Sequence, residues 1–233
     1  MKKTQRVLTG AMLVALGLVL AAGAAYAVAP MGCNQLDNGM GTVDLPPGCP
    51  YVSPSQLHMI IAGLPAGTTI LLAPQHAEFF CRSSTTTGPC HVSGGPLGGE
   101  VENFTSTVVF QLSGTGSLSG WTRTVTVPLA VQVATAPRSA GASVQTFNTN
   151  MELIQGAISG GDPDFASLQI IGGTANGFSS PGSTTLTRQS NGSWNVVSSF
   201  NVGYTITFTG AAGGRLSGLG GTTKGTVVMQ AGR

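Results

Sequence analysis

Alternation of apolar and polar residues runs through most of this chain of 233 residues and limits the folds open to it. In the clearest stretch, from Arg123 to Val133, apolar residues occupy every second position: Val125, Val127, Leu129, Val131 and Val133. A period of two places one face of a β-strand in a core and the other face in solvent. The same pattern occurs at 104–112, 194–200 and 202–208. We therefore expect these stretches to be β-strands.

The rest of the sequence predicts an all-β fold, either an antiparallel β-sandwich or a barrel-like sheet. Further strand candidates lie at 68–73, 144–158, 167–171, 184–188 and 222–230, separated by segments rich in Gly, Ser and Pro. Short strands without long helices between them are typical of antiparallel folds. Asn191-Gly192 predicts a hairpin turn, because both residues accept positive φ. Pro128 cannot donate to a ladder, so it predicts an edge strand or a bulge.

One short helix is expected near 54–62. The sequence Ser-Pro-Ser-Gln at 53–56 has the form of a capping box, with proline at the first helical position. The apolar residues that follow at helical spacing are Leu57, Ile60, Ile61 and Leu64. Gly63 is a stop signal, so the helix would have about two turns.

An internal repeat relates residues 103–132 to residues 201–230. Pairs at the same offset include Asn103 and Asn201, Phe110 and Phe208, and Gln132 and Gln230. The sequence Leu-Ser-Gly also recurs, at 118–120 and at 216–218. Chance agreement in a sequence rich in Gly, Ser and Thr is the alternative. Because the alternation aligns together with the identities, we expect two similar β units that share one core.

The first 27 residues have the form of a cleaved secretory signal. Basic residues precede an apolar stretch from Val7 to Ala22, and Ala25-Tyr26-Ala27 is an A-x-A cleavage motif. The apolar stretch is too short for a membrane span, which needs ~20 apolar residues. We expect cleavage after Ala27 and a secreted, periplasmic or cell-surface protein with no membrane span after signal removal. Residues 28–52 would form an N-terminal disulfide-containing segment, and 53–233 the β domain.

Four cysteines lie between residues 33 and 90. An even number of cysteines in an exported chain predicts disulfides, and the sequence leaves three connectivities open. We favour Cys33–Cys49 and Cys81–Cys90, because both would close short loops. The sequence has no C-x2-C or H-x3-H spacing, so a zinc site is not favoured. A lipid-modified Cys33 is a minor alternative.

The charged residues exclude two classes of partner. Without the signal, seven basic residues stand against eight acidic ones, and neither sign forms a cluster. Nucleic-acid binding and adhesion to anionic membranes both depend on grouped Lys and Arg. We therefore expect no nucleic-acid partner. The remaining candidates are an envelope component, a polysaccharide or a second copy of the chain.

Three short sequences in the C-terminal half carry a resemblance. They are Thr-Thr-Leu-Thr at 184–187, Trp-Asn-Val at 194–196 and the ending Thr-Thr-x-Gly-Thr at 222–226. In these features the chain resembles uncharacterised exported β-sheet proteins of environmental bacteria. These proteins have no assigned activity, so the resemblance implies a β fold and no catalytic residue.

Several polar pairs have the composition of catalytic or metal sites. His76 and Glu78 would share one face of an extended strand, although a polar surface pair is the preferred interpretation. Paired acids at Glu100 and Glu102, or at Asp162 and Asp164, have the chemistry of a glycosidase or a calcium site. We prefer an exposed strand face for the first pair and a turn cap for Asp162. No catalytic residue, metal ligand or cofactor is therefore assigned.

The two tryptophans are the remaining candidates for ligand contact. Trp194 is in phase with Val196 and Phe200, so we expect it to be buried. Trp121 opens a long strand, and we expect it to be the more exposed ring and a candidate platform for stacking on a sugar.

These observations favour an exported, non-enzymatic β-sheet protein with a structural or interaction role at the cell envelope or outside the cell. One form of that role is self-association through edge strands. A carbohydrate-binding module that uses Trp121 is the first alternative. A secreted hydrolase that uses His76, Glu78 or the acids near Glu100 is the second.

Overall fold

The computed structural model describes residues 32–54, 58–60, 62–81 and 90–232, and for residues 58–60 and 81 it describes the backbone alone. The expected signal peptide therefore lies outside the described residues. The elements are β1 (Asn34–Gln35), β2 (Tyr51–Val52), β3 (His58–Ile60), β4 (Ile70–Cys81), β5 (His91–Ser93), β6 (Glu100–Gly114), η1 (Gly116–Leu118), β7 (Thr122–Thr135), β8 (Val144–Ser159), β9 (Phe165–Gly172), η2 (Thr174–Asn176), β10 (Pro181–Arg188), β11 (Trp194–Gly210) and β12 (Gly220–Ala231). Across these ranges, no helix has the length and apolar character needed to cross a membrane.

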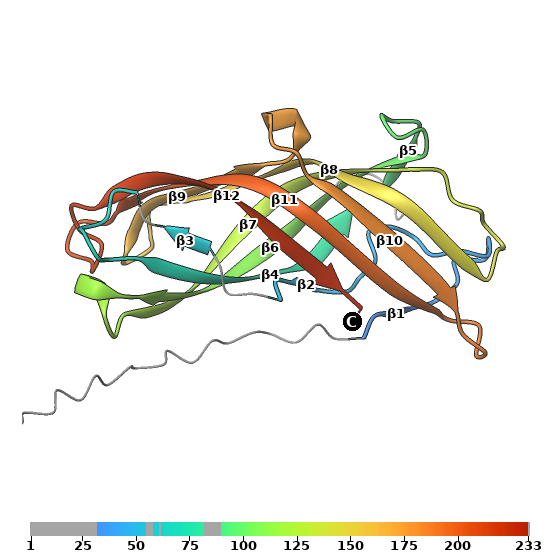
Figure 1. Cartoon of the computed structure of the whole chain (residues 1–233), viewed down its shortest axis with the longest axis horizontal. Helices are drawn as coiled ribbons and strands as arrows, with labels where there is room; N and C mark the ends of the chain where they lie inside the picture. Colours follow the sequence, from blue (N-terminus) through green and yellow to red (C-terminus); the bar gives the residue numbers. More distant parts are fainter. Residues whose placement is uncertain (1–31, 55–57, 61, 82–89, 233) are drawn as a thin grey trace, which may run out of the picture.

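The strands form one antiparallel sheet that closes on itself as an irregular ring, seen side-on in Figure 1. The long strands β4, β6, β7 and β8 follow one another around the ring. Strands β9 and β10 connect β8 to β11, which pairs with β12, and the short β2 joins β12 back to β4. The expected all-β, antiparallel architecture is confirmed. The sheet is a closed ring rather than two separate layers.

The ring is irregular because consecutive strands share positions in it. β9 pairs with the second half of β8 and the second half of β11, whereas β10 pairs with the first half of each. Together β9 and β10 fill one place, and residues 173–180 between them leave the sheet at the top of Figure 1. β4 and β5 are arranged in the same way along β6, and β2 and β3 along β4.

The core fills the inside of the ring, because alternate residues of every long strand point inward. On β6 the inward residues run from Glu102 through Phe104 to Leu112, and on β7 from Val125 to Val133. On β11 they run from Trp194 to Phe208. The alternations expected at 104–112, 123–133, 194–200 and 202–208 are therefore confirmed, and the last two belong to one strand.

Different parts of the chain close the two ends of the ring. At one end, the rings of Trp121 and Phe208 pack against Phe165, with centroid distances of 6.5 and 6.1 Å. Leu118 and Leu216, from the loops after β6 and β11, are buried with them. At the other end, residues 33–52, called here the N-terminal segment, cover the core.

The helix expected near 54–62 is wrong where the structure describes it. Residues 55–57 and 61 lie outside the described residues, but His58–Ile60 is a strand that pairs with β4. A helix of two turns is marginal on its own, since each end leaves backbone groups unpaired. Pairing with β4 gives this backbone hydrogen-bond partners that the capping signal could not supply.

Two local predictions, the hairpin turn at Asn191-Gly192 and the edge or bulge position of Pro128, can be compared with the structure. β10 and β11 form the expected hairpin, with Gly192 at φ 86° and the Asn191 side chain accepting from the Ser193 amide. Of the two turn residues, Gly192 takes the positive φ and Asn191 does not. Pro128 lies in β7 opposite Thr107, one residue before β7 begins to pair with β8. Its missing N–H therefore falls where one side of β7 is open.

The two proposed repeat units both form long hairpins, β6–β7 and β11–β12, whose inward faces meet in the same core. Their registers differ. Phe110 lies opposite Val125, whereas Phe208 lies opposite Gly221. In both hairpins the paired residues keep their own faces, because the difference in register is an even number of residues. The duplication itself stays a prediction.

Candidate ligand-binding cavity

The interior of the ring contains a cavity of about 90 Å³. Its wall is mainly apolar and comes from strands all around the ring. Representative lining residues are Phe104, Val108, Met151, Ile170, Val202 and Met229. An apolar cavity of ~150 Å³ in another protein holds benzene, a molecule of six heavy atoms. By that measure, this cavity has room for about four heavy atoms.

Two inward polar groups in this region have partners. His76 Nε2 shares a hydrogen bond with Ser106 Oγ, and both residues are buried. Burial lowers the pKa of His76 to about 4, so the imidazole is neutral at neutral pH. Burial likewise raises the pKa of Tyr51 to about 12, and its hydroxyl bonds to Ser198. These groups have satisfied hydrogen bonds and can form part of the wall.

Glu102 receives no hydrogen bond from the described residues, and it makes this cavity a candidate site. Its side chain lines the cavity and is 1% exposed. Among the described residues, no N–H or O–H group donates to either carboxyl oxygen. Burial and, next, the charge of Glu100 raise the pKa of Glu102 to about 8. A side-chain hydrogen bond with Glu100 raises the pKa further, so the carboxyl is mainly protonated at neutral pH and its O–H donates to Glu100.

Two further polar atoms near Glu102 are buried and lack a partner within the described ranges. One is Oγ1 of Thr149, which lines the same cavity from β8. The other is Nδ1 of His91, whose residue lies in register with Glu102 on β5. Buried polar atoms are nearly always hydrogen-bonded, so such a group calls for an explanation. A ligand or an ordered water is the usual one.

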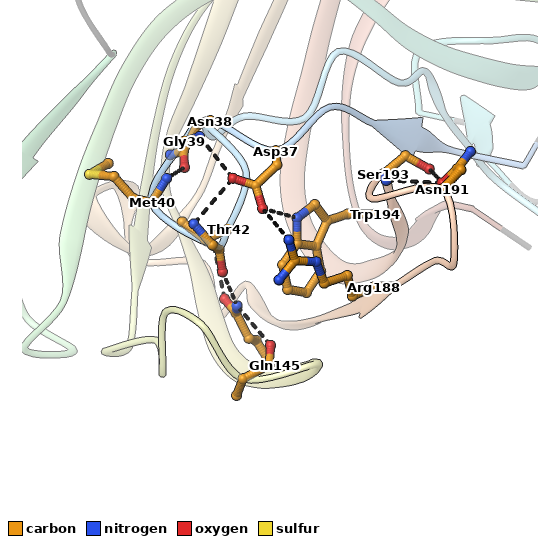
Figure 2. A network of polar contacts seen from close by, with 12 residues as sticks. Asp37, Asn38, Gly39, Met40, Thr42, Gln145, Arg188, Asn191, Ser193 and Trp194 are labelled. Carbon is orange, nitrogen blue, oxygen red and sulfur yellow. Dashed lines mark hydrogen bonds and ion pairs between the residues drawn. The ribbon is translucent and has the colours of Figure 1, made fainter.

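The N-terminal segment covers the end of the cavity nearest Glu102. Leu45, Pro46 and Pro47 form part of the cavity wall. Figure 2 shows how the beginning of the segment is attached: the indole N–H of Trp194 donates to Asp37 at 3.0 Å, and Thr42 donates to Gln145 at 2.8 Å. The hydrogen bond from Trp194 lowers the pKa of Asp37.

Arg138 fixes the middle of the N-terminal segment to the ring. Its guanidinium donates to both carboxylate oxygens of Glu100, at 2.8 and 3.1 Å, and to the Val43 carbonyl at 2.7 Å. It also lies over the ring of Phe147, 5.7 Å from the centroid. The Arg138 charge is therefore paired with Glu100 rather than with Glu102.

The disulfide expected between Cys33 and Cys49 is confirmed, with Cα atoms 5.7 Å apart. It ties the two ends of the N-terminal segment together. The other expected pair, Cys81 and Cys90, cannot be described because the side chain of Cys81 lies outside the described residues. That pairing stays a prediction.

The structure separates His76 from Glu78. A bulge follows Ala77, and Glu78 takes a φ of 56°, which shifts the alternation of β4. His76 points into the core, whereas Glu78 lies toward the outside and accepts from the Thr107 hydroxyl at 2.8 Å. The shared face that a simple extended strand would give them is therefore wrong.

Trp121 is buried, and its expected exposure is wrong. The ring is 7% exposed and its N–H donates to Asp164 at 3.2 Å. Arg123 and the Arg215 amide bind the same carboxylate, so Trp121 belongs to the closed end of the ring. In this position it offers no face for stacking on a sugar. Trp194 is buried as expected, with no exposed surface.

Of the remaining acids, Asp162 forms the expected turn cap, whereas Glu102 does not lie on the expected exposed strand face. Asp162 Oδ1 accepts from the amides of Asp164 and Phe165, as a turn cap does. Glu102, by contrast, lies in the core, so the exposed strand face expected for it is wrong. Within the described part of the chain, no group of three or more His, Cys, Asp or Glu is placed to hold a metal ion.

A signal for Glu102 is present in the sequence. Glu102 is two residues before Phe104, so it continues the apolar alternation of β6 onto the inward face. An acid in phase with a core stripe indicates either a strand end or an internal polar site. No protein-family model, no curated protein and no solved structure matches the chain.

Proposed function

We propose that this chain is an exported, non-enzymatic binding protein that holds a small, largely apolar molecule inside its ring. The observation that supports the proposal is the Glu102 carboxyl, which is buried against an apolar cavity and receives no hydrogen bond from the described residues. Ligand pockets typically combine such a wall with a few convergent polar groups. Export is supported by the signal-like residues 1–27 and by the disulfide, a bond that persists in oxidising compartments.

The cavity volume limits the affinity. The best small ligands gain about 1.5 kcal/mol per heavy atom, so four atoms give about 6 kcal/mol. The corresponding dissociation constant is on the order of 10⁻⁴–10⁻⁵ M. Met151 and Met229 line the cavity, and unbranched methionine side chains repack readily, which allows for somewhat longer ligands.

Methionine methyl signals in NMR spectra test the proposal. The purified chain, labelled at its methionine methyl groups, is titrated with short primary alcohols from ethanol to hexanol. We expect Met151 and Met229 to shift saturably, while Met40, which is 65% exposed and does not line the cavity, stays in place. The longest alcohol that binds measures how far the cavity expands.

A pair of variants localises the binding. Val108→Phe fills the cavity from β6 and should abolish the shifts, whereas Val228→Phe adds the same bulk on the outer face of β12 and should not. Far-UV circular dichroism checks that both variants fold. If no alcohol shifts Met151 or Met229, or if Val228→Phe removes binding as Val108→Phe does, the proposal is wrong.

A cell fractionation tests the export part separately. We expect the chain outside the cytosol, with its mass reduced by cleavage after Ala27. A cytosolic chain that keeps residues 1–27 would contradict this part and leave the cavity proposal standing.

A further inference from the structure

The charges around Glu102 indicate which polar group of a ligand should bind to this carboxyl. This inference rests on the proposed function and concerns the same cavity. The charged groups that act on Glu102 are Glu100 and Asp44, which are acidic, and Arg138, which is basic. Arg138 is already held by both oxygens of Glu100. Glu102 therefore lies among acids with no cation of its own in the described part of the chain.

The hydrogen-bonding chemistry points in the same direction. An ionised carboxylate accepts only, with room for about four donors. Among the described residues that line the cavity, Thr149 supplies one unpartnered hydroxyl, and none is a lysine or an arginine. A protonated primary amine carries three N–H donors and a positive charge. It would give an ionised Glu102 both the hydrogen-bond donors and the positive charge that the described residues around it do not supply.

Aromatic rings line the wall near this point. Phe104 follows Glu102 on the inward face of β6, and Phe79 packs against it with ring centroids 5.7 Å apart. Tyr51 contacts Phe79 in turn, at 6.0 Å. Ring faces attract cations, most strongly where water is excluded. The same rings also pack well against a short alkyl chain.

We propose that the polar group bound at Glu102 is the ammonium group of a short alkyl amine, and that its binding releases the proton that the carboxyl carries in the empty cavity. The balance is one ammonium in and one proton out to solvent, so the net charge of the cavity does not change. The amine nitrogen keeps its three protons, and the Glu102 O–H bond is the bond that breaks.

The release of one proton makes the affinity depend on pH. With the pKa of Glu102 raised to about 8, the ionised fraction grows about tenfold per pH unit below that value. Affinity for an amine should therefore rise about 50-fold between pH 6 and pH 8. A neutral alcohol of the same size needs no ionised carboxylate and should bind with little pH dependence.

Other titratable groups face the site and must be controlled. They are Glu100 on β6, Asp44 and Tyr51 in the N-terminal segment, Arg138 after β7, His91 on β5, His76 on β4 and Tyr204 on β11. The pKa of His76 is lowered to about 4 and those of both tyrosines are raised to about 12, so these three do not titrate between pH 6 and 8. A His91→Gln variant controls for the remaining imidazole on β5.

The test compares propylammonium with 1-propanol, which have about the same number of heavy atoms as the cavity can hold. Both are titrated into the oxidised protein at pH 6, 7 and 8, with the methyl signals of Met151 and Met229 as the readout. We expect a slope near one in log affinity against pH for propylammonium and a slope near zero for propanol. Glu102→Gln should lose the amine and keep the alcohol. Glu78→Gln, outside the cavity, should keep the slope. A slope that disappears in His91→Gln would assign the released proton to His91 and overturn the inference.

Each outcome decides between the two proposals. The amine inference is wrong, and the cavity function stands, if propanol binds but propylammonium binds no better at pH 8 than at pH 6. The same holds if propylammonium still binds to the Glu102→Gln variant. If neither compound shifts Met151 or Met229, the cavity holds only water, and both proposals are wrong.

Discussion

Replacing Glu102 by Gln should stabilise the protein, and by an amount that grows with pH. The Glu102→Gln substitution keeps the size of the side chain and removes its ability to ionise. In the folded protein the pKa of Glu102 is about 8, against 4.5 for an ordinary glutamate. Below pH 4.5 both states carry the proton and the group contributes no pH-dependent term. Above it the unfolded chain ionises while the folded chain does not, so stability is lost as pH rises.

The size of the effect follows from the two pKa values. Each pH unit between them costs about 1.36 kcal/mol of unfolding free energy. Between pH 5 and pH 8 the native protein should therefore lose about 3.5 kcal/mol relative to Glu102→Gln, because each titration is gradual near its own pKa. Well above pH 8 both states are ionised and the difference becomes constant.

Urea unfolding of both proteins at pH 5, 6, 7 and 8 measures this difference, in buffers free of primary amines. The native protein must be compared with the variant at each pH, because His76 makes the unfolding free energy rise with pH over part of this range, whereas Glu102 makes it fall. Glu78→Gln, on the outside of β4, is the control for replacing a glutamate that does not face the cavity. A Glu102→Gln difference that stays flat from pH 5 to 8 would refute the reasoning.

Four further predictions use the same unfolding assay or fluorescence. Relative to His76→Gln, the native protein should lose about 2 kcal/mol of unfolding free energy between pH 7 and pH 5, because the pKa of His76 is about 4 in the folded protein and 6.5 in an ordinary histidine. Equal dependence of the unfolding free energy on pH in both proteins would contradict this. Replacing Cys33 and Cys49 by Ser should cost about 3 kcal/mol, since the disulfide spans a separation of 16 residues, and an unchanged urea midpoint would oppose that view. Arg138→Ala should cost about 2–3 kcal/mol by freeing Glu100 and the Val43 carbonyl, against less than about 1 kcal/mol for the more exposed Arg188→Ala; equal losses would argue against the Arg138 attachment. In Trp194→Phe, the fluorescence of Trp121 should resist iodide quenching, and strong quenching would show that the ring is exposed after all.

The strands that could be predicted from the sequence are those whose inward residues are uniformly apolar. From Val125 to Val133 every second residue is apolar, so the period alone predicted both the strand and its inward face. The helix near 54–62 failed for the opposite reason. Its signals were local, whereas the strand at His58–Ile60 depends on pairing with β4, a partner that the local pattern does not reveal.

The candidate site was harder to predict because its residues break local rules. Glu102 is in phase with Phe104, but an acid on a core stripe is normally assigned to the surface. Trp121 is in phase with Val125, and the glycine before it obscured this relation. The positive φ of Glu78 reverses the face of β4, and no residue type announces such a bulge. The cavity itself arises only when distant strands close the ring.

The two-residue strand β2 is a weakly paired part of the ring, because only two of the described residues join β12 to β4 there. On one side Val52 pairs with Gln230 of β12, and on the other Tyr51 and Val52 pair with His76 and Gln75 of β4. Longer ladders hold the rest of the circumference, such as the one between β6 and β7. Local opening should therefore begin at this seam, where amide hydrogen exchange is expected to be fastest. Molecules could then exchange with the interior through a sidewall fluctuation while the remaining sheet stays folded.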